Sequence, residues 1–267
     1  MFRLAPGRLF YCLIVSEPIG LAAMAEEIDI KKVARQHLDM DRFFAGDFSI
    51  KSEKSRTREQ SLQAEADQAA GRMERIAGRV RACRRCPLGE LRTNAVPGEG
   101  GWRGCIAFIG EAPGADEDAQ GRPFVGRAGK LLDKIIAAMG LKRQDVFIGN
   151  ILKCRPPDNR DPRPDEIVKC LPYLQEQLDV LKPETIVALG AHAARTLLDN
   201  NKSIGQLRGK FHDYYPGAMA KPIKLMATYH PAYLLRNYSD ASRRAVWEDM
   251  QQVLKELGLP IPDHGRK

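Results

Sequence analysis

From residue 75 onward, short apolar runs alternate with longer amphipathic stretches. Four runs rich in β-branched and aliphatic residues predict strands, at 105–109, 146–149, 185–189 and 223–228. Four longer stretches with apolar positions three and four residues apart predict helices, at 126–139, 164–181, 191–199 and 241–257. This alternation is typical of a parallel sheet with helices on both faces. We therefore expect an α/β fold, a three-layer α/β/α sandwich around a mostly parallel sheet.

Polar residues follow each predicted strand. Glu111 comes after the first strand, Asn150 after the second, His192 shortly after the third and His230 after the fourth. In open parallel sheets, ligands bind beyond the carboxyl ends of the strands. A carboxylate, an amide and a histidine therefore converge on one edge of the sheet, which is the predicted site.

Composition and charge narrow the class of protein. The chain has 267 residues, 43% of them hydrophobic and 28% charged, a balance typical of globular proteins. No apolar run approaches the ~20 residues of a membrane span. The net charge is +8, and the excess lies after residue 74, where 31 basic residues face 22 acidic ones. This charge favours a polyanionic partner, nucleic acid first, over the alternative of a merely solvated basic surface.

The N-terminal part differs in pattern. Residues 46–72 are polar, charged and low in aromatics, and they predict a linker that becomes helical from about Ser61. Two arginines, the apolar run 9–15 and the small residues after it loosely resemble a secretory signal. We favour an unstructured extension, or residues upstream of a start at Met24, because export would separate the chain from a nucleic-acid partner.

Four of the six cysteines form one pattern. Cys83 and Cys86 make a C-x2-C pair, and Cys154 and Cys170 follow far downstream. Four thiolates match either tetrahedral zinc or an iron–sulfur cluster. Zinc sites usually combine two closely spaced pairs, whereas only one pair is close here, which favours a cubane cluster. Buried free thiols are the alternative.

Two further segments carry candidate chemistry. Residues 110–129, GEAPGADEDAQGRPFVGRAG, contain several glycines that let the backbone approach a ligand, but they match neither a P-loop nor a dinucleotide motif. Phe124 in this polar segment suits stacking on a base, or a small apolar cluster. His230 opens the second segment, TYHPAYLLR, and its position at a strand end favours function.

The same second segment ends in two leucines and an arginine. We expect Leu234 and Leu235 to fall in a loop beside Arg236. Apolar side chains next to a cation suit insertion into a base step, with the cation on a phosphate. The alternative is the first turn of a helix with a buried leucine pair.

Together these segments resemble the family 4 uracil-DNA glycosylases, the iron–sulfur branch of that superfamily. The matching pieces are CRRCPL, GEAPGADEDAQGRPFVGRAG, IGNILKCRPPDNRDP, Cys170 and TYHPAYLLR, and they span about residues 75–257. The resemblance implies a catalytic domain with the uracil-DNA glycosylase-like fold over residues 71–259. An extension or linker, poorly ordered, would precede it at 1–70, and a tail would follow at 260–267.

The resemblance implies base excision repair by hydrolysis of the bond between uracil and deoxyribose. The nucleotide is flipped out, and free uracil and an abasic site are the products. The transition state has a cationic sugar and an anionic uracil. His230 matches the histidine that, as a neutral ring, donates a hydrogen bond to uracil O2. Glu111 matches the acid that positions water and favours the sugar cation, and Ala112 stands where the best-known branch carries the catalytic aspartate.

Other matches concern recognition. Asn150 matches the asparagine that reads the N3–H and O4 edge of uracil and so rejects cytosine, and Phe124 matches the aromatic ring on which the base stacks. Glu117 would crowd the C5 position against thymine. Backbone groups from Gly110 to Gly114 would line the pocket. Leu234 or Leu235 would be the wedge and Arg236 a phosphate contact.

The resemblance also implies a cofactor. Cys83, Cys86, Cys154 and Cys170 match the ligands of one [4Fe-4S] cluster, and we expect a structural role because hydrolysis needs no electron. We expect no catalytic metal. A covalently trapping relative carries a histidine in an extra basic loop, and no such insert follows the strand at 146–150, so we expect turnover.

Uracil-containing DNA is the expected partner, with no membrane partner, a monomeric state, and a cytoplasmic location on the nucleoid during repair. A uracil-DNA-binding module of the same fold, non-catalytic or covalently trapping, is the alternative. A zinc-bound nucleotide hydrolase would need metal-ligating carboxylates that the sequence does not reveal. The presence of Glu111, Asn150 and His230 favours the enzyme.

Overall fold

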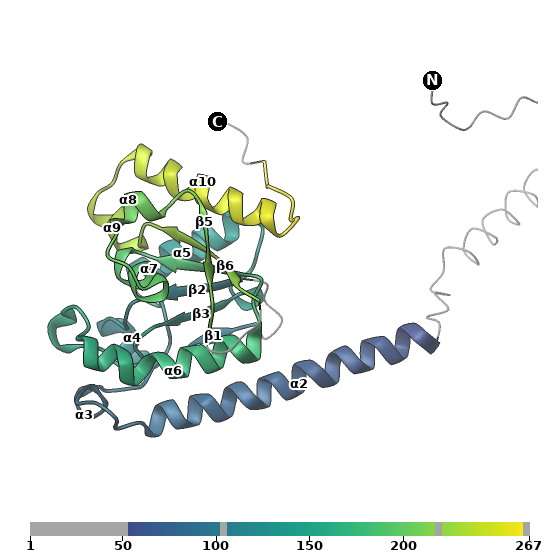
Figure 1. Ribbon diagram of the computed structural model, residues 1–267, viewed down its shortest axis with the longest axis horizontal. Helices are drawn as coiled ribbons and strands as arrows, with labels where there is room; N and C mark the ends of the chain where they lie inside the picture. The colour runs from purple at the N-terminus through teal and green to yellow at the C-terminus, as the bar shows by residue number, and fades with distance from the viewer. Residues whose placement is uncertain (1–52, 102–105, 217–220, 264–267) are drawn as a thin grey trace, which may run out of the picture. The chain divides into compact units, whose positions relative to one another are not determined.

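The computed structural model describes residues 53–101, 106–216 and 221–263 (Figure 1). Residues Arg56–Lys267 form one compact unit. The signal-like start and the extension up to residue 52 lie outside the described residues. No helix in the described part of the chain is long and apolar enough to cross a membrane.

A six-stranded sheet forms the centre of this unit (Figure 1). Its order is β1-β3-β2-β4-β6-β5. The strands are β1 (Glu99–Gly100), β2 (Ile106–Gly110), β3 (Phe147–Asn150), β4 (Thr185–Leu189), β5 (Phe211–Tyr214) and β6 (Ile223–Thr228). The four inner strands are parallel to one another, and β1 and β5 pair antiparallel at the edges. The mostly parallel sheet is therefore confirmed.

The four inner strands match the predicted ones within one residue, but both edge strands were missed. β1 has only two residues, too few to show any periodicity. β5 contains His212 and Asp213 and is buried only at Tyr214, so it lacks the apolar run of an inner strand.

Helices cover both faces of the sheet, as predicted. The longer ones are α2 (Glu53–Ala82), α5 (Arg127–Ala138), α6 (Pro164–Leu181), α7 (Ala191–Leu198) and α10 (Asp240–Glu256). The shorter ones are α3 (Leu88–Leu91), α4 (Ala115–Gln120), α8 (Ile204–Leu207), α9 (Pro231–Arg236), η1 (Arg143–Asp145) and η2 (Pro157–Asn159). Side chains of α2, α6 and α7 pack on one face of the sheet, and those of α5, α9 and α10 pack on the other. On β2, Ala107 and Ile109 face the first group while Ile106 and Phe108 face the second.

The start of the N-terminal helix differs from the prediction. α2 begins at Glu53, before the predicted start near Ser61, and the expected domain boundary at residue 70 lies inside it. The sequence of α2 is rich in alanine, glutamate, glutamine and arginine, which favour helix even where no side chain is buried. Among the residues of α2 whose burial is described, 64–82, the buried ones are Met73, Ile76, Ala77 and Val80. The first half of α2 is polar and has no apolar period, so the sequence predicts a linker there.

Candidate active site

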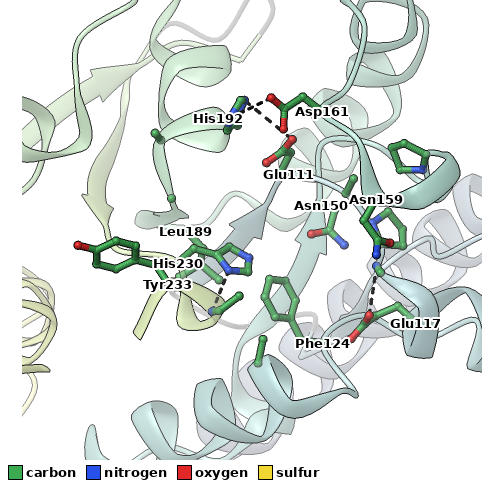
Figure 2. A pocket seen from close by; sticks show the side chains of 18 of the residues that line it. Glu111, Glu117, Phe124, Asn150, Asn159, Asp161, Leu189, His192, His230 and Tyr233 are labelled. Carbon is green, nitrogen blue, oxygen red and sulfur yellow. Dashed lines mark hydrogen bonds and ion pairs between the residues drawn. The ribbon is translucent and has the colours of Figure 1, made fainter. Parts of the chain in front are cut away.

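A cavity of about 660 Å³ lies at the carboxyl ends of the inner strands (Figure 2). The chain leaves β2 toward β3 on one side and later adds β4 and β6 on the other, so this is the topological switch point of the sheet. Predicted site residues that line the cavity are Glu111, Ala112, Gly114, Glu117, Phe124, Asn150, His230 and Arg236. The structure thus brings together residues from three separate segments, 110–129, the end of β3 and 228–236.

His230 is half-buried at the start of α9 and faces Phe124 across the cavity, with 5.7 Å between the ring centroids. Its Nδ1 accepts a hydrogen bond of 3.0 Å from the backbone N–H of Ala232, which caps the helix. Burial lowers the pKa of His230 to about 4, and the nearby Arg236 acts in the same direction. The imidazole is therefore neutral near pH 7, with its proton on Nε2 as a hydrogen-bond donor.

Asn150 ends β3 and is 2% exposed. Its Oδ1 is buried without a hydrogen-bond partner among the described residues. Gly110 makes room for it, because a Cβ at residue 110 would lie 2.4 Å from this oxygen and 2.7 Å from the ring of Phe124. A buried acceptor left unpaired costs about 1–3 kcal/mol, so a ligand N–H that reaches it is strongly favoured.

Phe124 adopts an unusual backbone conformation, with φ of 50°. Such a left-handed conformation is costly for a residue with a side chain and persists only when its surroundings hold it. Arg143 supplies this support: its guanidinium donates to the carbonyl oxygens of Phe124 and Pro123 and pairs with Glu99 and Asp133. The aromatic ring is thereby held beside the cavity.

Glu117 has a structural role that the sequence did not indicate. Its carboxylate accepts hydrogen bonds from the backbone N–H groups of Gly114, Val125 and Gly126, at 2.9–3.1 Å. These bonds tie the two ends of the glycine-rich segment together. The crowding of C5 by Glu117 stays a prediction.

Glu111 belongs to a row of three titratable groups at one end of the cavity (Figure 2). Its Oε1 lies 3.9 Å from Nδ1 of His192, and Nε2 of His192 lies 3.8 Å from Oδ2 of Asp161. Burial raises the pKa of Glu111, His192 opposes this effect and Asp161 adds to it.

Sequence reasoning noted His192 only as a residue near a strand end, and it missed Asp161, which lies in a loop with no local signal. Together with Glu111 they place three ligand atoms within 4.8 Å of one another, a spacing that admits a metal ion. The sequence alone did not reveal that two carboxylates and a histidine lie this close together.

The two leucines of α9 have different environments. Both lie in a short helix, so the predicted loop is wrong. Leu234 is 4% exposed and packs in the core beneath α9, whereas Leu235 is 44% exposed. Leu234 would have to leave the core to reach DNA, whereas Leu235 is already accessible. Arg236 is exposed at the rim of the cavity.

The four predicted cysteine ligands line one small pocket, and none of them forms a disulfide. They come from three elements: the chain after α2, the loop after β3 and helix α6. Arg92 donates to the sulfur of Cys154 at 2.9 Å, and the backbone N–H of Lys153 donates to the sulfur of Cys170 at 3.2 Å. Burial raises the pKa of both thiols, that of Cys170 to about 11.

The spacing of the sulfurs bears on the kind of metal centre. Among the described residues, no three cysteine sulfurs lie within 4.8 Å of one another. One tetrahedral zinc ion with bonds of about 2.3 Å would hold its sulfurs about 3.8 Å apart. In a cubane each thiolate binds a different iron, so its sulfurs lie farther apart than those around one zinc ion.

Comparison with known proteins defines the class. Residues 97–251 match the family profile described as "Uracil DNA glycosylase superfamily". The chain belongs to this superfamily.

Several similar proteins are named type-4 uracil-DNA glycosylase. The type-4 uracil-DNA glycosylase of Saccharolobus solfataricus is 46% identical over 190 residues, which cover 69% of this chain and 86% of that protein. The Thermotoga maritima protein of the same name is 46% identical over 182 residues, 68% and 92% of the two chains. That of Archaeoglobus fulgidus is 45% identical over 194 residues, 71% and 96%. The resemblance to family 4 is thereby confirmed.

Proposed function

We propose that this protein is a uracil-DNA glycosylase that releases uracil from DNA in base excision repair. The observation that carries the proposal is the pairing of two groups in one cavity. The buried, unpartnered Oδ1 of Asn150 matches the N3–H of uracil, and the neutral His230 offers an N–H donor where charge develops on the leaving base. The names of the type-4 relatives support the same activity.

In the proposed reaction, the uracil lies between Phe124 and the groups that read its edge. Asn150 accepts from N3–H and donates to O4. Cytosine presents an acceptor at N3 and a donor at position 4, so it would meet both groups with the wrong polarity. His230 Nε2–H donates a hydrogen bond to O2. This hydrogen bond strengthens as the uracil anion forms, which lowers the barrier because the donor is preorganised in the site.

Glu111 acts on the sugar side in this proposal. An ionised carboxylate there favours the developing sugar cation and orients the attacking water. Burial disfavours that ionised state, and the neighbouring His192 restores it in part. The bond from C1′ to N1 breaks, water adds its oxygen to C1′, and the water proton leaves through the carboxylate to solvent or to the uracil anion.

The cysteine pocket fits one [4Fe-4S] cluster bound by Cys83, Cys86, Cys154 and Cys170. Four thiols from three elements, with N–H donors on two sulfurs, match the ligand set and the outer hydrogen bonds of such clusters. When bound, the cluster would link three parts of the chain to one another: the segment after α2, the loop after β3, and α6. It takes no part in the hydrolysis.

Uracil-containing DNA is the proposed partner, held in part by Arg236 on a phosphate and by Leu235 in the base stack. We propose that the protein acts as a monomer in the cytoplasm, on the nucleoid. Domain limits at 71–259, with a separate extension and tail, also belong to this proposal, although α2 runs across the first limit.

A cleavage assay on oligonucleotides that carry a single uracil tests the activity. The expected result is uracil release with many turnovers, no release from cytosine or thymine controls, and a large loss in Glu111→Gln with DNA binding retained. Binding without release would refute the glycosylase and favour the binding module. A complex that survives denaturation would favour the covalent trap.

A second experiment tests the cluster. Protein purified without oxygen should contain four iron and four sulfide per chain, and Cys170→Ala should lose iron and unfold at lower temperature. Stoichiometric zinc in place of iron, or full stability of the iron-free protein, would refute the structural cluster.

A further inference from the structure

An ordered column of side chains leads from the core to the rim of the cavity. Asp249, fully buried on α10, holds the guanidinium of Arg208 through two hydrogen bonds of 3.0 and 3.1 Å. That guanidinium lies over the ring of Tyr229, 5.4 Å from its centroid. Tyr229 in turn stacks on Tyr233, with 5.0 Å between centroids and 22° between planes.

The column ends at a ring that a ligand can reach. Tyr233 lines the cavity and is 36% exposed, and Tyr229 stacks on one of its faces. Among the described residues, the ring contacts of Tyr233 involve Tyr229 alone, which leaves its second face for a ligand. Because Tyr229 and Arg208 hold the ring, little side-chain entropy is lost when a partner stacks on it. None of the roles given above to α9 uses this ring.

We propose that Tyr233 is a stacking platform for the nucleobase next to the uracil on the same strand. The proposal rests on the glycosylase function and extends it to a second subsite. Tyr233 stands three residues beyond His230, roughly 4.5 Å along the axis of α9. Neighbouring bases in a stacked strand are about 3.4 Å apart, and flipping one of them exposes a face of the other.

The chemistry identifies the ligand as any base rather than a particular one. Every nucleobase has a π face, and a tyrosine ring stacks on it without reading hydrogen bonds. The guanidinium of Arg208 lies over the ring of Tyr229 and is attracted to its π electrons. This attraction holds the stacked rings in a fixed orientation. The platform therefore compensates the stacking that the flanking base loses, whatever the sequence around the uracil.

A coupling experiment tests the platform. Single-turnover uracil release is measured for the wild type and Tyr233→Ala on oligonucleotides whose 5′ or 3′ neighbour of uracil is either a normal base or a tetrahydrofuran abasic analogue. Tyr233→Ala should lower kcat/KM about tenfold on the normal oligonucleotide, as expected for loss of one stacked base. The same substitution should lower kcat/KM less than twofold when the neighbour of uracil on one side is abasic. Tyr233→Phe should keep the wild-type difference between normal and abasic neighbours. Tyr215→Ala changes an exposed tyrosine that does not line the cavity, and it should leave kcat/KM unchanged on every oligonucleotide.

The outcomes separate the two proposals. An equal penalty for Tyr233→Ala on every oligonucleotide would show a structural role and overturn the platform, while uracil release by the wild type would still support the glycosylase. Absence of release by the wild type on all oligonucleotides would overturn both.

Discussion

His230 makes two different hydrogen bonds, and one substitution separates them. Its Nδ1 caps α9 through Ala232 N–H, while Nε2–H is the donor proposed for uracil O2. In His230→Asn the amide oxygen replaces Nδ1, since asparagine is a favoured N-cap residue, but the side chain is too short to place a donor at the Nε2 position. The rate should therefore fall while the fold is kept.

The size of the effect follows from the site. Loss of one preorganised donor to a developing anion costs about 10²–10³ in rate, or 2.7–4 kcal/mol. The half-buried ring of His230, which its cap at Ala232 holds in place, is this kind of donor. The change in unfolding free energy should stay below about 1 kcal/mol for Asn, whereas His230→Ala also loses the cap and about 1 kcal/mol more.

Single-turnover uracil release at saturating enzyme measures the first quantity, and urea unfolding measures the second. Imidazole ¹⁵N spectra of the wild type should show an unprotonated Nδ1 and a protonated Nε2 throughout pH 5–8. A rate within tenfold of the wild type for His230→Asn, or a DNA affinity that falls as much as the rate, would refute the assigned role. So would titration of His230 near pH 6.5.

Three further predictions concern selectivity, pH and the core. Asn150→Asp should slow uracil release and raise the relative release of cytosine, because a carboxyl can present a donor where the amide presented none; unchanged selectivity in a competition assay would exclude Asn150 from base reading. The lowered pKa of His230, about 4 against about 6.5 when unfolded, means that the unfolded state binds more protons between these values. As the pH falls through this window, the wild type should lose stability faster than His230→Asn by about 1.4 kcal/mol per pH unit, and parallel curves from urea unfolding would contradict this. Asp249→Ala leaves the guanidinium of Arg208 without its buried partner and should destabilise the fold by about 3–5 kcal/mol, and a loss under 1 kcal/mol on chemical unfolding would count against a tight pair.

The layered fold was predictable because local patterns record which side of each element is buried. The inner strands, Thr185–Leu189 for example, are continuous apolar runs because both of their faces meet helices. Helix α6 was predicted with its observed limits, Pro164–Leu181, since its apolar positions recur with the helical period and proline is favoured in the first turn. β1 and most of β5 have no run of buried residues, so no hydrophobic pattern in the sequence predicts them.

The candidate site was partly predictable for a topological reason. Parallel strands end at one edge, so Glu111, Asn150 and His230 could be expected together without knowledge of the strand order. The motifs around them indicated the family. The proton on Nε2 of His230, however, depends on the cap at Ala232, and the open acceptor of Asn150 depends on its neighbours in space.

Contacts between distant segments were decided only by the tertiary structure. Sequence patterns report a residue's own burial, whereas a contact such as Asp161 with His192 depends on strand order, register and loop path at once. Leu234 and Leu235 are adjacent and chemically identical, yet packing against the core makes one buried and the other exposed. The column from Asp249 to Tyr233 joins three elements that no local period connects, because side-chain stacking between elements leaves no periodic trace along the chain.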